Sequence, residues 1–229
     1  MGPFASLPMS PRLLSIAILL SAVVAIAGAI LGGDGVWLLY IGKPLTTLLI
    51  LLLAASAVPS VGKRYRVAVL AGMALSLVGD VLLMLPTDLF VPGLIAFLLA
   101  HVGYIAAFAP GSSAKARVAA GVALALVAGA NLAGLLPHIG ADLKIPVLAY
   151  VAVLATMAAL ALARAWTPVI AQALPRSARF AAAGGLAFVL SDSLLAWDKF
   201  GGGLPLAPPL ILSTYWFAQW CIARSVQAR

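Results

Sequence analysis

The chain has 229 residues, of which 64% are hydrophobic and 9% are charged, and it carries a formal net charge of +8 with no glutamate. Soluble domains contain about 25% charged residues, so this composition excludes a water-soluble globular protein. The single cysteine, Cys221, excludes an internal disulfide and an iron–sulfur or zinc-finger site. The chain is therefore predicted to be an all-α polytopic membrane protein, whose apolar surface is buried in lipid and between helices.

Apolar stretches recur along the chain between short polar breaks. A helix needs about 20 such residues to cross the hydrocarbon core of a bilayer. We expect eight transmembrane helices, at residues 13–31, 36–56, 67–85, 90–109, 115–135, 145–163, 178–198 and 205–224. No break is long enough for a separate soluble domain, so residues 1–229 are expected to form one integral membrane domain.

The lysines and arginines predict the orientation, because cytoplasmic loops are enriched in them. The opposite loops hold only Lys144 and Lys199. Eleven lie on the other side, in the amino-terminal segment, alternate loops and the tail: Arg12, Lys63, Arg64, Arg66, Lys115, Arg117, Arg164, Arg176, Arg179, Arg224 and Arg229. Both termini are thus predicted to be cytoplasmic. Topology and attraction to anionic headgroups account for the net charge, so no nucleic-acid partner is expected.

The first apolar stretch also has the features of a signal peptide. Arg12 precedes the apolar run, and AIAGA at 25–29 has the small residues of a cleavage site. The run is long for a signal peptide, so we expect it to be retained as a helix. The remaining loops predict the same orientation in either case.

Ionisable side chains inside spanning helices are costly and therefore indicate functional sites. The charged examples are Lys43, Asp80 and Asp192. Counting about 1.5 Å per residue from the helix ends places all three in the outer half of the bilayer, at the level of Tyr150 and Tyr215. The sequence therefore predicts a polar cavity that opens on the non-cytoplasmic side.

Helical spacing groups further polar residues on common faces. His101 and Tyr104 are three residues apart, and Tyr215 and Gln219 are four apart, so each pair shares one side of its helix. These residues are expected to line a partly aromatic pocket. A structural interpretation stays open for each: the tyrosines as packing residues, and His101 as an interhelical hydrogen-bond partner.

Lys43 also has a structural interpretation, as the ion-pair partner of one of the two aspartates. Such a pair leaves the other carboxylate without a partner. Pro44 removes one helix hydrogen bond and is expected to push Lys43 away from helical dihedral angles.

The helix predicted at 115–135 carries small residues at regular spacing. Gly121, Ala125 and Gly129 recur every four residues. Small residues at this spacing allow two helix backbones to approach each other in a membrane. We therefore expect close packing of this helix against a neighbour.

Several blocks of sequence resemble the YhhN/TMEM86 family of integral membrane proteins. They are KPLTTLLILLLA at 43–54, LVGDVLLMLP at 77–86, FLLAHVGYIAAF at 97–108, and FVLSDSLLAWDKF at 188–200 followed by STYWFAQ at 213–219. The resemblance implies an eight-helix bundle and the activity of a lysoplasmalogenase, which hydrolyses the vinyl ether bond of a lysoplasmalogen to a fatty aldehyde and a glycerophospho-alcohol. It also implies two intramembrane aspartates acting as acid and base, which match Asp80 and Asp192.

Vinyl ether hydrolysis fits this pair of residues. A proton is delivered to the alkenyl carbon, and water captures the resulting oxocarbenium ion, so the reaction needs one protonated acid and one ionised carboxylate. Two neighbouring carboxylates in a low-dielectric site do not both ionise easily, so one keeps its proton. Our working hypothesis from the sequence is that Asp80 donates the proton and Asp192 activates the water.

The other polar residues are expected to bind the lysophospholipid substrate. Lys43 would stabilise the ionised aspartate or bind the lipid phosphate. The headgroup or water would be positioned by the remaining candidates, His101, Tyr104, Tyr150, Tyr215 and Gln219.

Other classes of function also fit intramembrane acids: a proton-coupled transporter, a non-catalytic lipid-sensing protein, and a metal-dependent lipid amidase or esterase. The chain has two histidines, His101 and His138, and the second falls in a loop, so no metal or other cofactor is expected. The Ala-, Gly- and Arg-rich composition is typical of bacteria, which favours the bacterial cytoplasmic (inner) membrane and leaves a related lysolipid open as the substrate.

Overall fold

The computed structural model describes residues 10–228, so Arg229 of the basic tail lies outside the described residues. Long helices form at all eight predicted positions, within four residues at each end. They are α1 (Pro11–Leu31), α2 (Val36–Ala55), α3 (Lys63–Met84), α4 (Phe90–Phe108), α5 (Ala114–Leu135), α6 (Ala141–Trp166), α8 (Pro175–Phe200) and α9 (Ala207–Ser225). Three short elements join them: η1 (Gly33–Gly35), η2 (Leu136–His138) and α7 (Pro168–Ala173).

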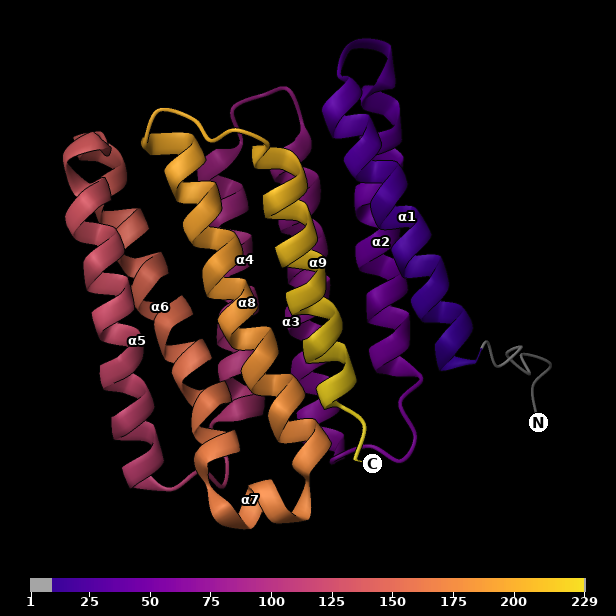
Figure 1. Ribbon diagram of the computed structural model, residues 1–229, viewed down its shortest axis with the longest axis vertical. Coiled ribbons are helices and arrows are strands. Elements are labelled where there is room, and N and C mark those ends of the chain that lie inside the picture. The colour runs from indigo at the N-terminus through magenta and orange to yellow at the C-terminus, as the bar shows by residue number, and fades with distance from the viewer. Residues whose placement is uncertain (1–9, 229) are drawn as a thin grey trace.

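Successive long helices run in opposite directions, so the start of α1 and the end of α9 lie at the same end of the bundle, where α7 also lies (Figure 1). The closest pairs are α8 with α9, α3 with α4, and α1 with α2. The carboxyl end is fastened to the segment between α2 and α3, because the amide of Val61 donates to Val226 O and the amide of Ala228 donates to Pro59 O, both at 2.9 Å.

Local sequence explains where several helices begin. The Ser10 hydroxyl accepts from the amide of Leu13 at 3.2 Å, and Ser113 accepts in the same way from Ala116 at 3.3 Å. Such side chains satisfy amides that have no partner inside the helix.

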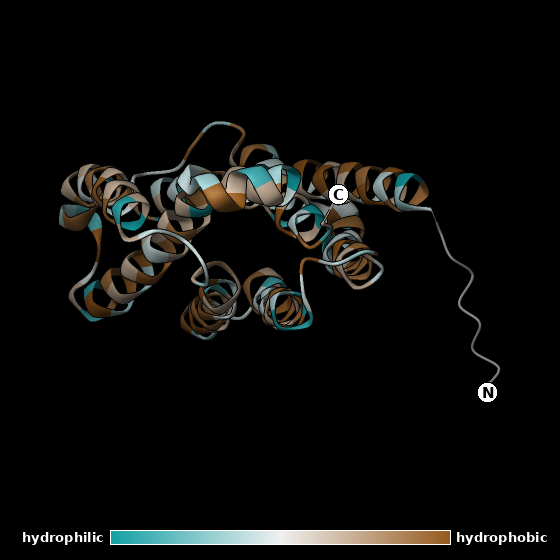
Figure 2. Cartoon of the chain, turned by 90° about the horizontal axis from the view of Figure 1, so that it is seen from below, coloured by the Kyte–Doolittle hydropathy of each residue, from teal (hydrophilic) through white to brown (hydrophobic). Residues whose placement is uncertain are grey.

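Viewed from the end that carries the termini, hydrophobic residues predominate along the helices (Figure 2). An arrangement of this kind suits burial in lipid.

Seven helices within residues 10–228 are long and apolar enough to cross a membrane: α1, α2 with η1, α3, α4, α5 with η2, α6 and α8. Together they make the chain an integral membrane protein. The remaining long helix, α9, differs from the expectation of an eighth apolar span. It contains Pro208, Pro209, Gln219 and Arg224, which lower its mean hydropathy. It packs against α8, α2, α1 and α3, and Gln219 is fully buried in it, whereas Arg224 is half-buried and Ser213 is exposed.

The prediction that Pro44 distorts its helix was wrong. Helix α2 is continuous from Val36 to Ala55, and Lys43 has helical geometry within it. Lipid offers no alternative partners for backbone groups, so the remaining hydrogen bonds keep the helix intact around the proline.

The expected close packing of α5 was also wrong. A Cβ atom built on Gly121 or Gly129 meets nothing within 4 Å, and Ala125 is exposed. Close approach occurs instead between α3 and α4, where a Cβ on Gly72 would lie 2.9 Å from the carbonyl oxygen of Ala100. Helix α5 packs mainly against α6, and its small residues lie on the side that faces outward.

Candidate active site

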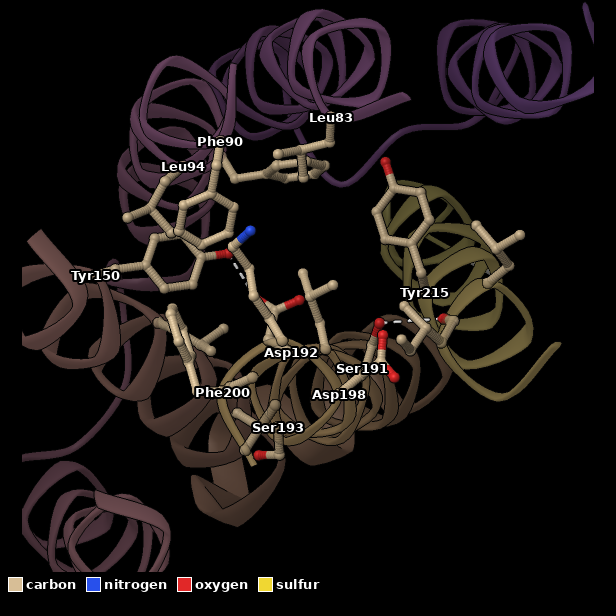
Figure 3. A pocket seen from close by; sticks show the side chains of 18 of the residues that line it. Leu83, Phe90, Leu94, Tyr150, Ser191, Asp192, Ser193, Asp198, Phe200 and Tyr215 are labelled. Atoms are coloured by element: carbon tan, nitrogen blue, oxygen red, sulfur yellow. Dashed lines mark hydrogen bonds between the residues drawn. The ribbon is translucent and has the colours of Figure 1, made fainter. Parts of the chain in front are cut away.

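A cavity of about 400 Å³ lies in the half of the bundle away from the termini, and all eight long helices contribute to its wall. Most of the lining is apolar. The cavity is lined by all five polar residues that the sequence predicts at one depth in the bilayer, namely Lys43, Asp80, Tyr150, Asp192 and Tyr215. Figure 3 shows Tyr150, Asp192 and Tyr215 around this space, on α6, α8 and α9. The five residues therefore meet in one cavity, as expected, but the cavity is largely apolar and not the polar one that the sequence predicted.

Asp80 on α3 is 1% exposed and has three partners from other helices. Its Oδ2 accepts from the Thr47 hydroxyl at 2.6 Å and from the Tyr215 hydroxyl at 2.8 Å. Its Oδ1 lies 3.5 Å from Lys43 Nζ. Two hydroxyl donors and an ammonium group are the surroundings that stabilise an ionised carboxylate.

Asp192 on α8 has fewer partners. Its Oδ2 accepts from the Tyr150 hydroxyl at 2.5 Å, and His101 Nε2 lies 3.7 Å from the same oxygen. Within residues 10–228, Oδ1 has no hydrogen-bond partner and no lysine or arginine forms an ion pair with this side chain. The Asp192 side chain is 13% exposed against 2% for Asp80, so it is the more accessible acid from the cavity.

His101, Tyr104 and Gln219 are fully buried and lie behind the cavity wall. The Tyr104 hydroxyl donates to Gln219 Oε1 at 2.8 Å, and Gln219 Nε2 donates to the Tyr215 hydroxyl at 3.3 Å. His101 Nε2 lies 3.0 Å from the Tyr150 hydroxyl. Since that hydroxyl donates to Asp192, its oxygen accepts from Nε2–H. Gln219, which Tyr104 contacts, therefore positions Tyr215, and His101 positions Tyr150.

Sequence reasoning did not place Phe188 in the site. Thr47 lies four residues after Lys43, and this helical spacing predicts that both share the face that lines the pocket; in the structure the Thr47 hydroxyl contacts Asp80 directly. Phe188 packs edge-on against His101 and Tyr215, with ring centroids 4.7 and 5.6 Å apart. An apolar ring in an apolar helix gives no signal of this kind.

The described part of the chain contains no group of three His, Cys, Asp or Glu side chains that could hold a metal ion. His138 lies in η2, where its Nδ1 is 3.1 Å from the Gly134 carbonyl oxygen. The metal-dependent interpretation therefore finds no set of ligands in residues 10–228.

The family model of the YhhN family matches residues 38–226. The chain belongs to the YhhN family. The match covers α2 to α9, so every polar residue that lines the cavity lies inside it. The resemblance seen in the sequence is thereby confirmed.

Curated proteins that are similar to this chain carry the name lysoplasmalogenase, among them the following three. Human lysoplasmalogenase TMEM86B is 37% identical over 155 residues, which are 66% of this chain and 59% of the relative. The Mycobacterium bovis lysoplasmalogenase is 38% identical over 167 residues, 69% of this chain and 60% of the relative. Lysoplasmalogenase TMEM86B of Sus scrofa is 32% identical over 189 residues, 80% and 72%. The chain thus spans about three fifths of the first two relatives. No solved structure matches it.

Proposed function

We propose that this protein is an intramembrane hydrolase that cleaves the vinyl ether bond of lysoplasmalogens, or of a related lysolipid, by acid–base catalysis with Asp80 and Asp192. The observation that carries the proposal is the presence of two carboxylates, from α3 and α8, in the wall of one largely apolar cavity. The names of the relatives support the choice of substrate.

The reaction proceeds in three steps. The acid transfers its proton to the alkenyl carbon remote from the ether oxygen, which converts the vinyl ether into an oxocarbenium ion. The carboxylate takes a proton from water as the water oxygen bonds to the cationic carbon, giving a hemiacetal. In the last step the carbon–oxygen bond to the glycerol breaks: the carboxyl group that took the proton from water gives it to the leaving oxygen, and the ionised acid takes the proton of the hemiacetal hydroxyl. The products are the alcohol and the fatty aldehyde, and both carboxyl groups return to their starting states. A nearby carboxylate stabilises the positive charge of the intermediate.

The contacts favour the reverse of the roles that the sequence suggested. Asp80 accepts from two hydroxyls and lies beside Lys43, so it serves as the ionised carboxylate that activates water. Asp192 has one hydroxyl donor, and its unpartnered Oδ1 carries the proton that is given to the substrate. Its greater exposure to the cavity suits direct contact with the alkenyl carbon.

The proposal includes the orientation of the bundle. Helix α9 is the eighth span, both termini are cytoplasmic, and residues 1–229 form one domain in a bacterial cytoplasmic membrane. The bias of lysine and arginine toward the end with the termini supports this orientation. The cavity then opens away from the cytoplasm.

The test is release of fatty aldehyde from a lysoplasmalogen by purified wild type, Asp80→Asn and Asp192→Asn in detergent, with an acyl lysolipid as the substrate control. Wild type alone should release aldehyde, and it should leave the acyl lipid intact. In D₂O the aldehyde should gain one deuterium on the carbon next to the carbonyl, after correction for exchange of free aldehyde. Absence of aldehyde from folded wild type, or equal rates in all three proteins, would favour a transporter or a lipid sensor.

A further inference from the structure

Lys199 lies in the last turn of α8 and lines the same cavity as the two aspartates. Its Nζ lies 4.3 Å from the centroid of the Phe90 ring on α4, and Phe90 in turn packs edge-on against Phe200 at 5.9 Å. Contact with an aromatic face holds an ammonium group in place without neutralising it. The ammonium group thus lies against the Phe90 ring at the end of α8 and keeps its charge.

The two lysines in the cavity wall differ in their partners. Lys43 Nζ lies 3.5 Å from Asp80 Oδ1, so its charge is already matched. For Lys199, no carboxylate of residues 10–228 lies within 4.0 Å of Nζ. The neighbouring Asp198 is engaged elsewhere, since its Oδ1 accepts from the amide of Leu204 at 2.9 Å. Of these two lysines, Lys199 is the one free to receive an anionic group from a ligand.

Asp192 and Lys199 are seven residues apart on one continuous helix and therefore lie on the same face, about 10 Å apart along its axis. Leu195 and Ala196, between them on this face, also line the cavity. This face of α8 thus carries an acid at one end, a cation at the other, and an apolar surface between them.

A lysoplasmalogen has matching dimensions. Seven covalent bonds separate the alkenyl carbon that is protonated from the phosphorus atom, and an extended chain advances about 1.2 Å per bond, or about 8 Å in all. The flexible lysine side chain covers the remaining difference. When the alkenyl carbon lies at Asp192, the phosphate therefore reaches Lys199.

We propose that Lys199, held against Phe90, binds the phosphate group of the lysolipid and makes the protein select phosphate-bearing lipids over neutral ether glycerols. This inference rests on the proposed function, because the distance is measured from the acid that protonates the substrate. Lys43, which the sequence offered for this role, instead stabilises Asp80. A charge-assisted contact to phosphate is worth about tenfold in affinity.

The test measures binding with saturated-ether ligands, which acid chemistry does not cleave. Affinities of an alkyl-ether lysophosphatidylcholine and of the corresponding neutral alkylglycerol are compared by calorimetry in detergent. The variants are Lys199→Gln, Lys199→Arg and, as a matched control, Lys144→Gln, which removes an exposed lysine at the same end of the bundle and outside the cavity.

Wild type, Lys199→Arg and Lys144→Gln should prefer the phospholipid by about tenfold, and Lys199→Gln should bind both ligands equally. Equal affinities in wild type, unchanged preference in Lys199→Gln, or an equal loss in Lys144→Gln would each overturn the inference. A preference that depends on Lys199, together with no aldehyde release from a lysoplasmalogen, would reject the hydrolase and retain the phosphate site.

Discussion

The hydroxyl of Tyr150 donates to Asp192 Oδ2 at 2.5 Å and accepts from His101 on its other side. Asp80 differs, because Thr47 and Tyr215 both donate to it. Two acids in one cavity therefore have unequal hydrogen-bond support, with one hydroxyl at Asp192 and two at Asp80. Removal of a single hydroxyl is then expected to have unequal effects on catalysis.

Tyr150→Phe should lower kcat for aldehyde release by about 10- to 100-fold, because the acid loses its one hydroxyl donor and His101 loses its acceptor. Tyr215→Phe should cost less than about tenfold, since Thr47 still donates to Asp80. Steady-state kinetics on both purified variants measures the difference. Equal losses would contradict the proposed division of roles between the two acids.

Lys43→Met should destabilise the protein, because it leaves the buried Asp80 without its cation. Loss of one partner of a buried ion pair costs about 3–5 kcal/mol. The double variant Lys43→Met with Asp80→Asn removes both charges and should recover most of that loss without recovering activity. Thermal unfolding in detergent provides the measurement, with Lys144→Met as the control at an exposed lysine. A double variant as unstable as the single one would argue against the ion pair.

The depth of the site could be predicted from the sequence because it depends on two simple quantities, the direction of each helix and the rise per residue. Asp80, Asp192 and Lys43 come from three helices and yet line one cavity, as counting residues from the helix ends predicted. The hydrophobic stretches likewise predicted where each long helix lies, since segment length is set by the bilayer.

The rotation of each helix about its own axis, and the helices that pack against it, could not be predicted in this way. The sequence left open which aspartate pairs with Lys43, because that choice depends on how α2 turns toward α3. His101 was expected in the cavity and lies one layer behind it, because Tyr150 comes between it and Asp192. The small residues of α5 led to a wrong prediction of close packing, because a glycine allows a neighbouring helix to approach but does not require one. Side-chain packing between helices determines all three features.

Gly72→Ala should destabilise the bundle, because the added methyl group would meet the backbone of Ala100 at 2.9 Å as well as the ring of Tyr104. Backbone cannot move aside cheaply, so overpacking of this kind costs about 1–3 kcal/mol. Gly121→Ala is the matched control. It adds the same methyl group in a helix where nothing lies within 4 Å, and should be neutral or stabilising by up to about 1 kcal/mol. Thermal unfolding of both variants in detergent distinguishes the sites, and equal effects would contradict the close contact of α3 with α4.

Labelling of single cysteines tests the orientation of the cavity. The native Cys221 is buried at 1% exposure, so wild type should not react with a membrane-impermeant maleimide. In spheroplasts, Asp142→Cys, at the cavity end, should react at once, whereas Lys115→Cys should react only after lysis. Ala228→Cys follows α9 and should behave like Lys115→Cys if that helix crosses the membrane. Immediate reaction at Ala228 with none at Lys115 would show that α9 does not span, and an exchange of the Asp142 and Lys115 results would turn the cavity toward the cytoplasm. In the expected case a lysolipid reaches Asp192 from the non-cytoplasmic side, and its phosphate stays beside Lys199 at that surface.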